Sequence, residues 1–61
     1  MKKYLTVKEV SNTLSVGYGK VLDLIALGDL KAIKLGKVYR ISPYALDQLI
    51  KSNEVKSFWK Q

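Results

Sequence analysis

Apolar residues near the start of the chain recur at intervals of three and four, the spacing that places side chains on one face of a helix. Residues 7–14 are therefore predicted to form a short first helix that depends on tertiary packing. Thr6 and Glu9 have the spacing of a capping box, in which each side chain bonds the backbone N–H of the other residue. The helix should therefore begin directly after Thr6. Its buried face consists of Val7, Val10, Ser11 and Leu14.

A second helical pattern follows after Ser15, Val16 and Gly17. Gly17 is suited to the N-cap of this helix, and Gly28 is suited to the left-handed position that ends it. Two short helices joined by about three residues that include a glycine form a helix-turn-helix arrangement. The buried stripe of the second helix consists of Val21, Leu24, Ile25 and Gly28.

Residues 31–41 alternate between apolar and polar positions, the period of a β-hairpin. A single apolar face requires Leu35 to lie opposite Tyr39, which leaves the three-residue loop 36–38. In this register Lys34 lies across from Arg40 on the outer face, where like charges are unfavourable unless an anion lies between them. We expect the following residues on the inner face: Ile33, Leu35, Tyr39 and Ile41.

The hairpin is followed by the features of a third helix. Ser42 is suited to the N-cap and Pro43 to the first helical position, and Asn53 is suited to the end of the helix. The fold class is therefore α+β: two short helices, a two-stranded basic wing hairpin and a third helix. We expect one domain over residues 1–61, with an ordered core at about 4–52 and a C-terminal tail at 53–61. The buried face of the third helix consists of Leu46, Leu49 and Ile50.

The composition excludes most catalytic chemistry. The 61 residues include no Cys and no His, so there is no thiolate nucleophile, no imidazole base and no ordinary zinc site. The five acidic residues form no pair that resembles an acid–base dyad, and there is no Gly-rich phosphate loop. We therefore expect no enzyme activity, no cofactor, no metal and no small-molecule ligand. No stretch approaches the ~20 apolar residues that span a bilayer, so we expect a cytoplasmic protein without membrane contact.

The positive charge is concentrated in one place. The formal net charge is +6, and four of the 11 Lys and Arg residues lie in the segment 31–40, which contains no acidic residue. A solvated surface usually mixes charges of both signs, so a dense cluster of one sign favours a polyanionic partner. The alternative is a lysine-rich surface that keeps a small domain soluble. The basic residues of the wing are Lys31, Lys34, Lys37 and Arg40.

Three stretches, LTVKEV, LSVGYGKVLDLIALGDLKAIKLGKVYRIS and ALDQLI, carry a family resemblance. Their order and spacing over about residues 4–50 resemble the excisionase-type family of small winged helix-turn-helix DNA-binding proteins, relatives of the MerR-like DNA-binding domain. The run from Gly28 to Ile41 is the most specific part. The resemblance implies a protein that acts on double-stranded DNA in a bacterial host cell. The second helix would enter the major groove, and the wing would contact the neighbouring minor groove or backbone.

The second helix departs from the family pattern at Tyr18, Gly19 and Asp23, where the family often has Arg, Ser or Thr, and Arg. Bidentate recognition of guanine or adenine requires Arg, Lys, Asn or Gln. Of these the DNA-facing side offers only Lys20, so we infer weak direct readout. Site selection would then depend on DNA shape and on several copies that bind side by side. The expected DNA-binding positions of this helix are Tyr18, Gly19, Lys20, Leu22, Asp23 and Ala26.

Three functions remain open at this point. The first is a recombination directionality factor, or excisionase, of a phage or mobile element, which binds and bends DNA cooperatively so that a site-specific recombinase excises it. The second is a small transcriptional regulator of the same fold. The third is a protein-binding adaptor that uses apolar residues of the tail. These residues either fold back onto the core or bind a recombinase or a neighbouring copy: Val55, Phe58 and Trp59.

Overall fold

The capping box places the start of the first helix as expected. The computed structural model describes residues 3–54, and its first helix, α1, is Val7–Leu14. The Thr6 hydroxyl accepts from the Glu9 N–H at 3.0 Å, and the Glu9 carboxylate accepts from the Thr6 N–H at 2.9 Å. Val7, Val10 and Ser11 are buried. The predicted helix and its cap are confirmed, as is its buried face except that Leu14 is only half-buried against the core.

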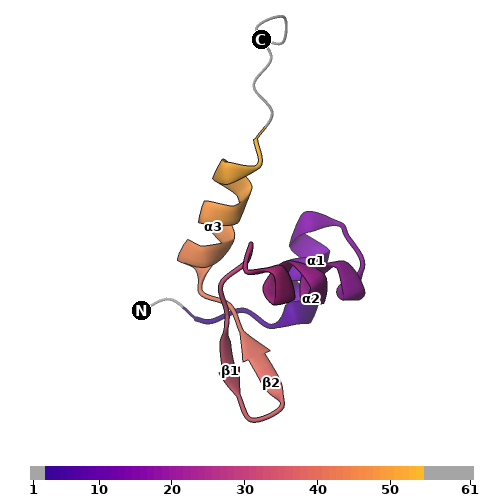
Figure 1. Cartoon of the computed structure of the whole chain (residues 1–61), viewed down its shortest axis with the longest axis vertical. Coiled ribbons are helices and arrows are strands. Elements are labelled where there is room, and N and C mark those ends of the chain that lie inside the picture. Colours follow the sequence, from indigo (N-terminus) through magenta and orange to yellow (C-terminus); the bar gives the residue numbers. More distant parts are fainter. Residues whose placement is uncertain (1–2, 55–61) are drawn as a thin grey trace, which may run out of the picture.

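Helix α2, Tyr18–Leu27, has a glycine at each end. Gly17 is the N-cap, and Gly28 ends the helix in the left-handed conformation with φ of 85°. The N–H groups of Asp29 and Leu30 both donate to the Leu24 carbonyl, at 2.9 and 3.1 Å, which turns the chain back towards the core. The second helix and the three-residue connection are therefore confirmed, and α1 and α2 form a helix-turn-helix pair beside the hairpin (Figure 1).

The register of the hairpin differs from the prediction by one residue. Strands β1, Ile33–Leu35, and β2, Val38–Arg40, are antiparallel, and Leu35 lies opposite Val38 rather than opposite Tyr39. The turn is therefore the two residues 36–37, not the three residues 36–38. Gly36 has φ of 64°, and a two-residue hairpin turn with glycine at its first position matches the natural twist of the strands. Turn geometry thus overrode the apolar pattern.

A one-residue shift moves the side chains of one strand to the opposite face of the hairpin. Ile33 and Leu35, predicted to face inward, are exposed, whereas Tyr39 is half-buried as expected. Lys34 lies opposite Tyr39, with its ammonium nitrogen 5.8 Å from the centre of the ring, and Arg40 lies opposite Ile33. The predicted contact between like charges at Lys34 and Arg40 is therefore wrong.

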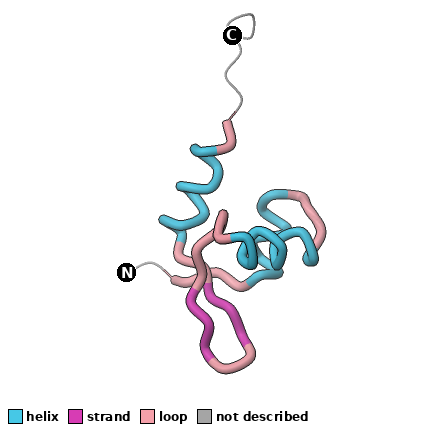
Figure 2. Tube along the Cα trace, in the orientation of Figure 1, coloured by secondary structure: helices cyan, strands magenta, loops and turns pink. Residues whose placement is uncertain are grey.

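A short backbone bridge ties the start of the chain to the end of the hairpin. The Leu5 N–H donates to the Ile41 carbonyl at 2.7 Å, and the Ile41 N–H donates to the Leu5 carbonyl at 2.9 Å. Ile41 is completely buried. Leu5 directly precedes the N-cap of α1, and Ile41 directly precedes the N-cap of the third helix, so this bridge joins the base of the hairpin to two helices. The strands themselves lie beyond this base, away from the helices (Figure 2).

The third helix, α3, is Pro43–Ser52. The Ser42 hydroxyl accepts from the Ala45 N–H at 3.0 Å, and Asn53 caps the end by donating from its side-chain amide to the Leu49 carbonyl at 2.9 Å. Both predicted ends are confirmed. Ile50 differs from the prediction: it is 39% exposed because it borders an open groove beside Leu14 instead of facing the core.

The core is small and lies where the three helices meet the base of the hairpin. Each helix and the residues that flank the hairpin contribute to it, so no element can leave without exposing it. Among residues 3–54, no helix is long and apolar enough to cross a membrane. The buried apolar residues are Val7, Val10, Val21, Leu30, Ile41, Leu46 and Leu49.

Two isoleucines of the hairpin segment test the register. Ile41→Ala should lower the free energy of unfolding by about 2–5 kcal/mol, because it leaves a cavity in the core. Ile33→Ala should lower it by about 1 kcal/mol or less, because the Ile33 side chain is 43% exposed. Urea unfolding of the two variants measures both values. Similar losses at the two positions would support the other register.

Candidate nucleic-acid interface

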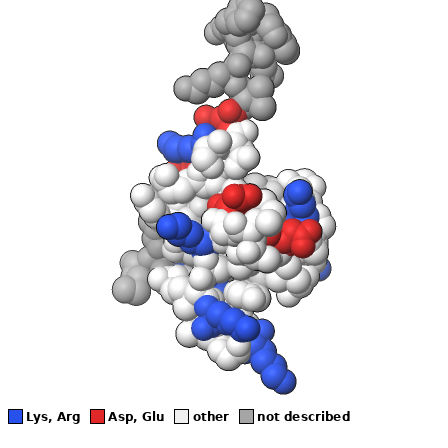
Figure 3. Space-filling model, viewed as in Figure 1, with Lys and Arg blue, Asp and Glu red and all other residues white. Residues whose placement is uncertain are grey.

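The projecting hairpin carries three cationic side chains: Lys34 on β1, Arg40 on β2 and Lys37 in the turn between them. Within residues 3–54, none of the three lies within ion-pair distance of a carboxylate. On the face shown in Figure 3, Lys and Arg atoms gather at the end of the hairpin among uncharged atoms, and the acidic atoms lie over the helical part. The hairpin is therefore positive along its length, and an external anion can neutralise it.

The register distributes these cations around the ribbon. Lys34 shares one face with Tyr39, and Arg40 lies on the other face. The Arg40 guanidinium donates to the Tyr39 carbonyl at 2.9 Å, which holds its planar group against the backbone of the ribbon. Lys37 extends from the turn. Anionic groups that flank the ribbon on both sides, as the two strands of a nucleic acid do, would each meet a cation.

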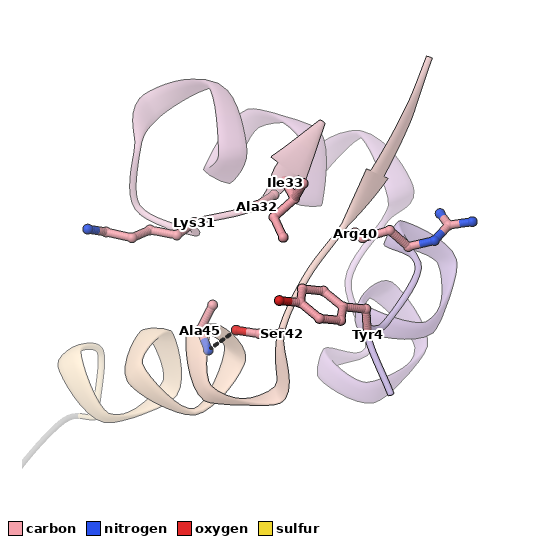
Figure 4. A pocket seen from close by; sticks show the side chains of 7 residues that line it. All are labelled: Tyr4, Lys31, Ala32, Ile33, Arg40, Ser42 and Ala45. Atoms are coloured by element: carbon pink, nitrogen blue, oxygen red, sulfur yellow. Dashed lines mark hydrogen bonds between the residues drawn. The ribbon is translucent and has the colours of Figure 1, made fainter. Parts of the chain in front are cut away.

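Lys31 occupies a different place from the one predicted. It precedes β1 and lies at the base of the hairpin, because the strand begins only at Ile33. Lys31 and Arg40 border opposite ends of one shallow hollow, and both side chains point away from it (Figure 4). The Tyr4 hydroxyl points into the hollow, between Ile33 and Ser42 (Figure 4). The projecting wing therefore unites three of the four predicted cations, and Lys31 supplies charge from the side that faces α3.

A second hollow joins the wing to the helix-turn-helix pair. Its walls come from the first turns of α1 and α2 and from the hairpin, so Tyr18 at the start of α2 lies across it from Lys37 and Arg40. Lys8 of α1 also borders this hollow. Lys8 is not among the residues predicted from the sequence to bind DNA, although the capping box already placed it on the first turn of α1. The lining residues are Thr6, Val7, Lys8, Tyr18, Lys37, Val38, Tyr39 and Arg40.

The exposed side of α2 matches most of the predicted DNA-binding positions. Leu22 is the exception, because it is half-buried and packs against the core. Lys20 is the only cation of this helix and Asp23 its only acid. The helix can therefore offer few strong hydrogen-bond donors to base edges. The positions that are exposed as expected are Tyr18, Gly19, Lys20, Asp23 and Ala26.

The predicted partner-binding residues Val55, Phe58 and Trp59 lie outside the described residues. The described chain ends beside an apolar groove, whose wall includes Ile50 and Asn53 at the end of α3. Within residues 3–54, no group of three or more acidic side chains is arranged to hold a metal ion.

A helix-turn-helix pair followed by a cationic hairpin and a third helix defines a winged helix-turn-helix domain, a class that binds double-stranded DNA. A family model described as a helix-turn-helix domain matches residues 4–54, and the chain belongs to this family, the excisionase-like family. No curated protein and no solved structure gives a significant match. The chain is thus a small DNA-binding domain, of a family whose members are typically not enzymes.

Proposed function

We propose that this domain holds DNA with two elements at once: α2 in the major groove and the hairpin on the adjoining backbone and minor groove. The observation that carries the proposal is the hollow shared by Tyr18, Lys37 and Arg40, since it places the start of α2 beside the cations of the wing. Helix N-termini and cationic side chains both favour phosphate oxygens. A single stretch of DNA backbone could therefore contact both elements.

In this proposal, the wing and α2 contribute unequally to the affinity for DNA. Lys34, Lys37 and Arg40 supply most of the electrostatic affinity, with Lys31 and Lys8 at the margins. Helix α2 contributes Lys20 and an acid, Asp23, which costs affinity near phosphates. Selection among DNA sites would then depend on the shape and deformability of the DNA and on neighbouring copies that bind side by side.

We propose, more specifically, that the protein is a recombination directionality factor of a phage or mobile element. A domain that binds the DNA backbone strongly and recognises bases weakly is suited to bending DNA. Its partners would be double-stranded DNA, neighbouring copies of itself and a site-specific recombinase. We further propose that residues 1–61 act as one winged domain, with Val55, Phe58 and Trp59 available for a protein contact.

The salt dependence of binding tests the role of the wing. With roughly four phosphate contacts, the slope of log affinity against log salt concentration should be about −3.6 on a mixed-sequence duplex. The double variant Lys34→Gln/Lys37→Gln should make this slope less steep by about 1.8, because two contacts are lost. Fluorescence anisotropy over a range of salt concentrations gives the slope for each protein.

Lys51→Gln is the control for this measurement. Lys51 lies on α3, with its ammonium nitrogen 4.0 Å from the Asp47 carboxylate, so its loss should leave the slope close to that of the wild type. An unaltered slope in the wing variant, or an equal change per charge in the control, would contradict the assignment of the wing as the main backbone contact.

Assays of DNA bending and of excision test the proposed role as a recombination directionality factor. The protein should bend DNA from the element that encodes it, as seen by the gel mobility of circularly permuted fragments, and should stimulate excision by the cognate recombinase. Binding near a promoter, with altered transcription and no effect on excision, would instead identify a transcriptional regulator. A footprint on the DNA that flanks the gene shows which sites each experiment should use.

A further inference from the structure

The tip of the hairpin carries two apolar side chains that the core does not use. Leu35 is 58% exposed and Val38 is 44% exposed, and they lie opposite each other directly before and after the turn 36–37. They share one face of the ribbon, and the hairpin projects away from the helices (Figure 1). An isolated exposed leucine is ordinary, but an apolar pair at the outermost point of a projecting element calls for a partner.

The charges around this pair favour DNA as that partner over protein. Lys34 directly precedes Leu35 in the sequence, and Lys37, in the turn, directly precedes Val38. The segment 31–40 has no acidic residue. Lysine is depleted in protein–protein interfaces, so a surface that mixes it so closely with apolar groups is poorly suited to one. Proteins that deform DNA through the minor groove combine cationic side chains with apolar residues that enter between bases.

The shape of the tip fits the same partner. Two antiparallel strands have backbones about 4.8 Å apart, and the van der Waals thickness of both strands makes the ribbon wider than the minor groove, which is about 6 Å wide. The whole ribbon is too thick to enter an undistorted minor groove, but the Leu35 and Val38 side chains, which project from one face beside the two-residue turn, are narrow enough to enter it. Deeper entry would widen the groove and separate neighbouring base pairs, which kinks the duplex.

We propose that Leu35 and Val38 form an apolar wedge that enters the minor groove and unstacks one base step. The inference rests on the proposed DNA-binding role of the wing and deepens it, because it assigns the bending of DNA to two named side chains. Arg40, on the same face as the pair, and Lys37, in the turn, hold the flanking phosphates, and the wedge favours steps that unstack easily. Pyrimidine–purine steps have this property in intact DNA.

A duplex with one weakened step tests the wedge directly. The probe is a 30-bp duplex with a single central T·T mismatch, compared with the fully paired duplex of the same sequence at low salt. The wild-type protein should bind the mismatched duplex about tenfold more tightly, equivalent to about 1.4 kcal/mol, because part of the unstacking is already done. Leu35→Thr/Val38→Thr should lose this preference, and 2-aminopurine beside the mismatch should brighten with the wild-type protein but not with this double variant.

Ile33→Thr is the matched control, because Ile33 is an exposed apolar residue on the same face but farther from the tip. Threonine keeps the β propensity of each position, and circular dichroism verifies the fold. The control should retain the preference for the mismatch. Loss of the preference in the control as well would overturn the wedge, since the effect would then belong to the whole face.

The remaining outcomes separate the two proposals. If the wild type binds both duplexes equally, the wedge is wrong and the proposed DNA-binding function stands. If the protein binds neither duplex at low salt, the proposed function fails and the wedge fails with it. If the double variant changes only the sedimentation of the free protein, Leu35 and Val38 serve a contact between copies, and the wedge is overturned.

Discussion

The arrangement of the domain depends on one pair of backbone hydrogen bonds, between Leu5 and Ile41. These residues lie far apart in sequence, and each directly precedes the N-cap of a helix. Their bridge fixes the start of α1, the base of the hairpin and the start of α3 relative to one another. Because Ile41 is also completely buried, the same residue anchors the hairpin by its backbone and the core by its side chain.

This anchoring separates stability from binding along the hairpin. At the base, Ile41 and the half-buried Tyr39 belong to the folded body. Beyond them, Leu35, Lys37 and Val38 are exposed and contribute little to the core. A firmly held base with a free tip lets the tip carry charge and apolar groups that would destabilise a packed surface. The wing can therefore be specialised for DNA without loss of the fold.

Local signals in the sequence were sufficient for the helices and insufficient for the hairpin register. The capping box at Thr6 and Glu9, the left-handed Gly28 and the Ser42 cap each act within a few residues, so the pattern alone located every helix. The register depended on a competition between the apolar alternation and the preference of Gly36 for a two-residue turn. The turn prevailed because the hairpin projects from the body, so exposed Ile33 and Leu35 side chains cost less than a strained turn.

The candidate site, like the fold, was predictable from the sequence only in part. The charge of residues 31–40 was evident from composition, and the exposed positions of α2 followed from the helical period. The partial burial of Leu22, the place of Lys31 at the base and the approach of Lys8 to the wing all depend on how distant elements pack. No local pattern contains that information, and the Leu5–Ile41 bridge, which joins the start of α1 to the base of the hairpin, has no signal in the sequence of either segment.

In the proposed function, the start of α2 and the hairpin form one continuous DNA-binding surface. An NMR titration of the ¹⁵N-labelled protein with a short duplex tests this most directly. Backbone amides of residues 18–20 and 34–40 should shift together, with Lys8 between them, whereas those of Asp47 and Lys51 on α3 should remain unchanged. Shifts centred on α3, with the hairpin amides unmoved, would contradict it.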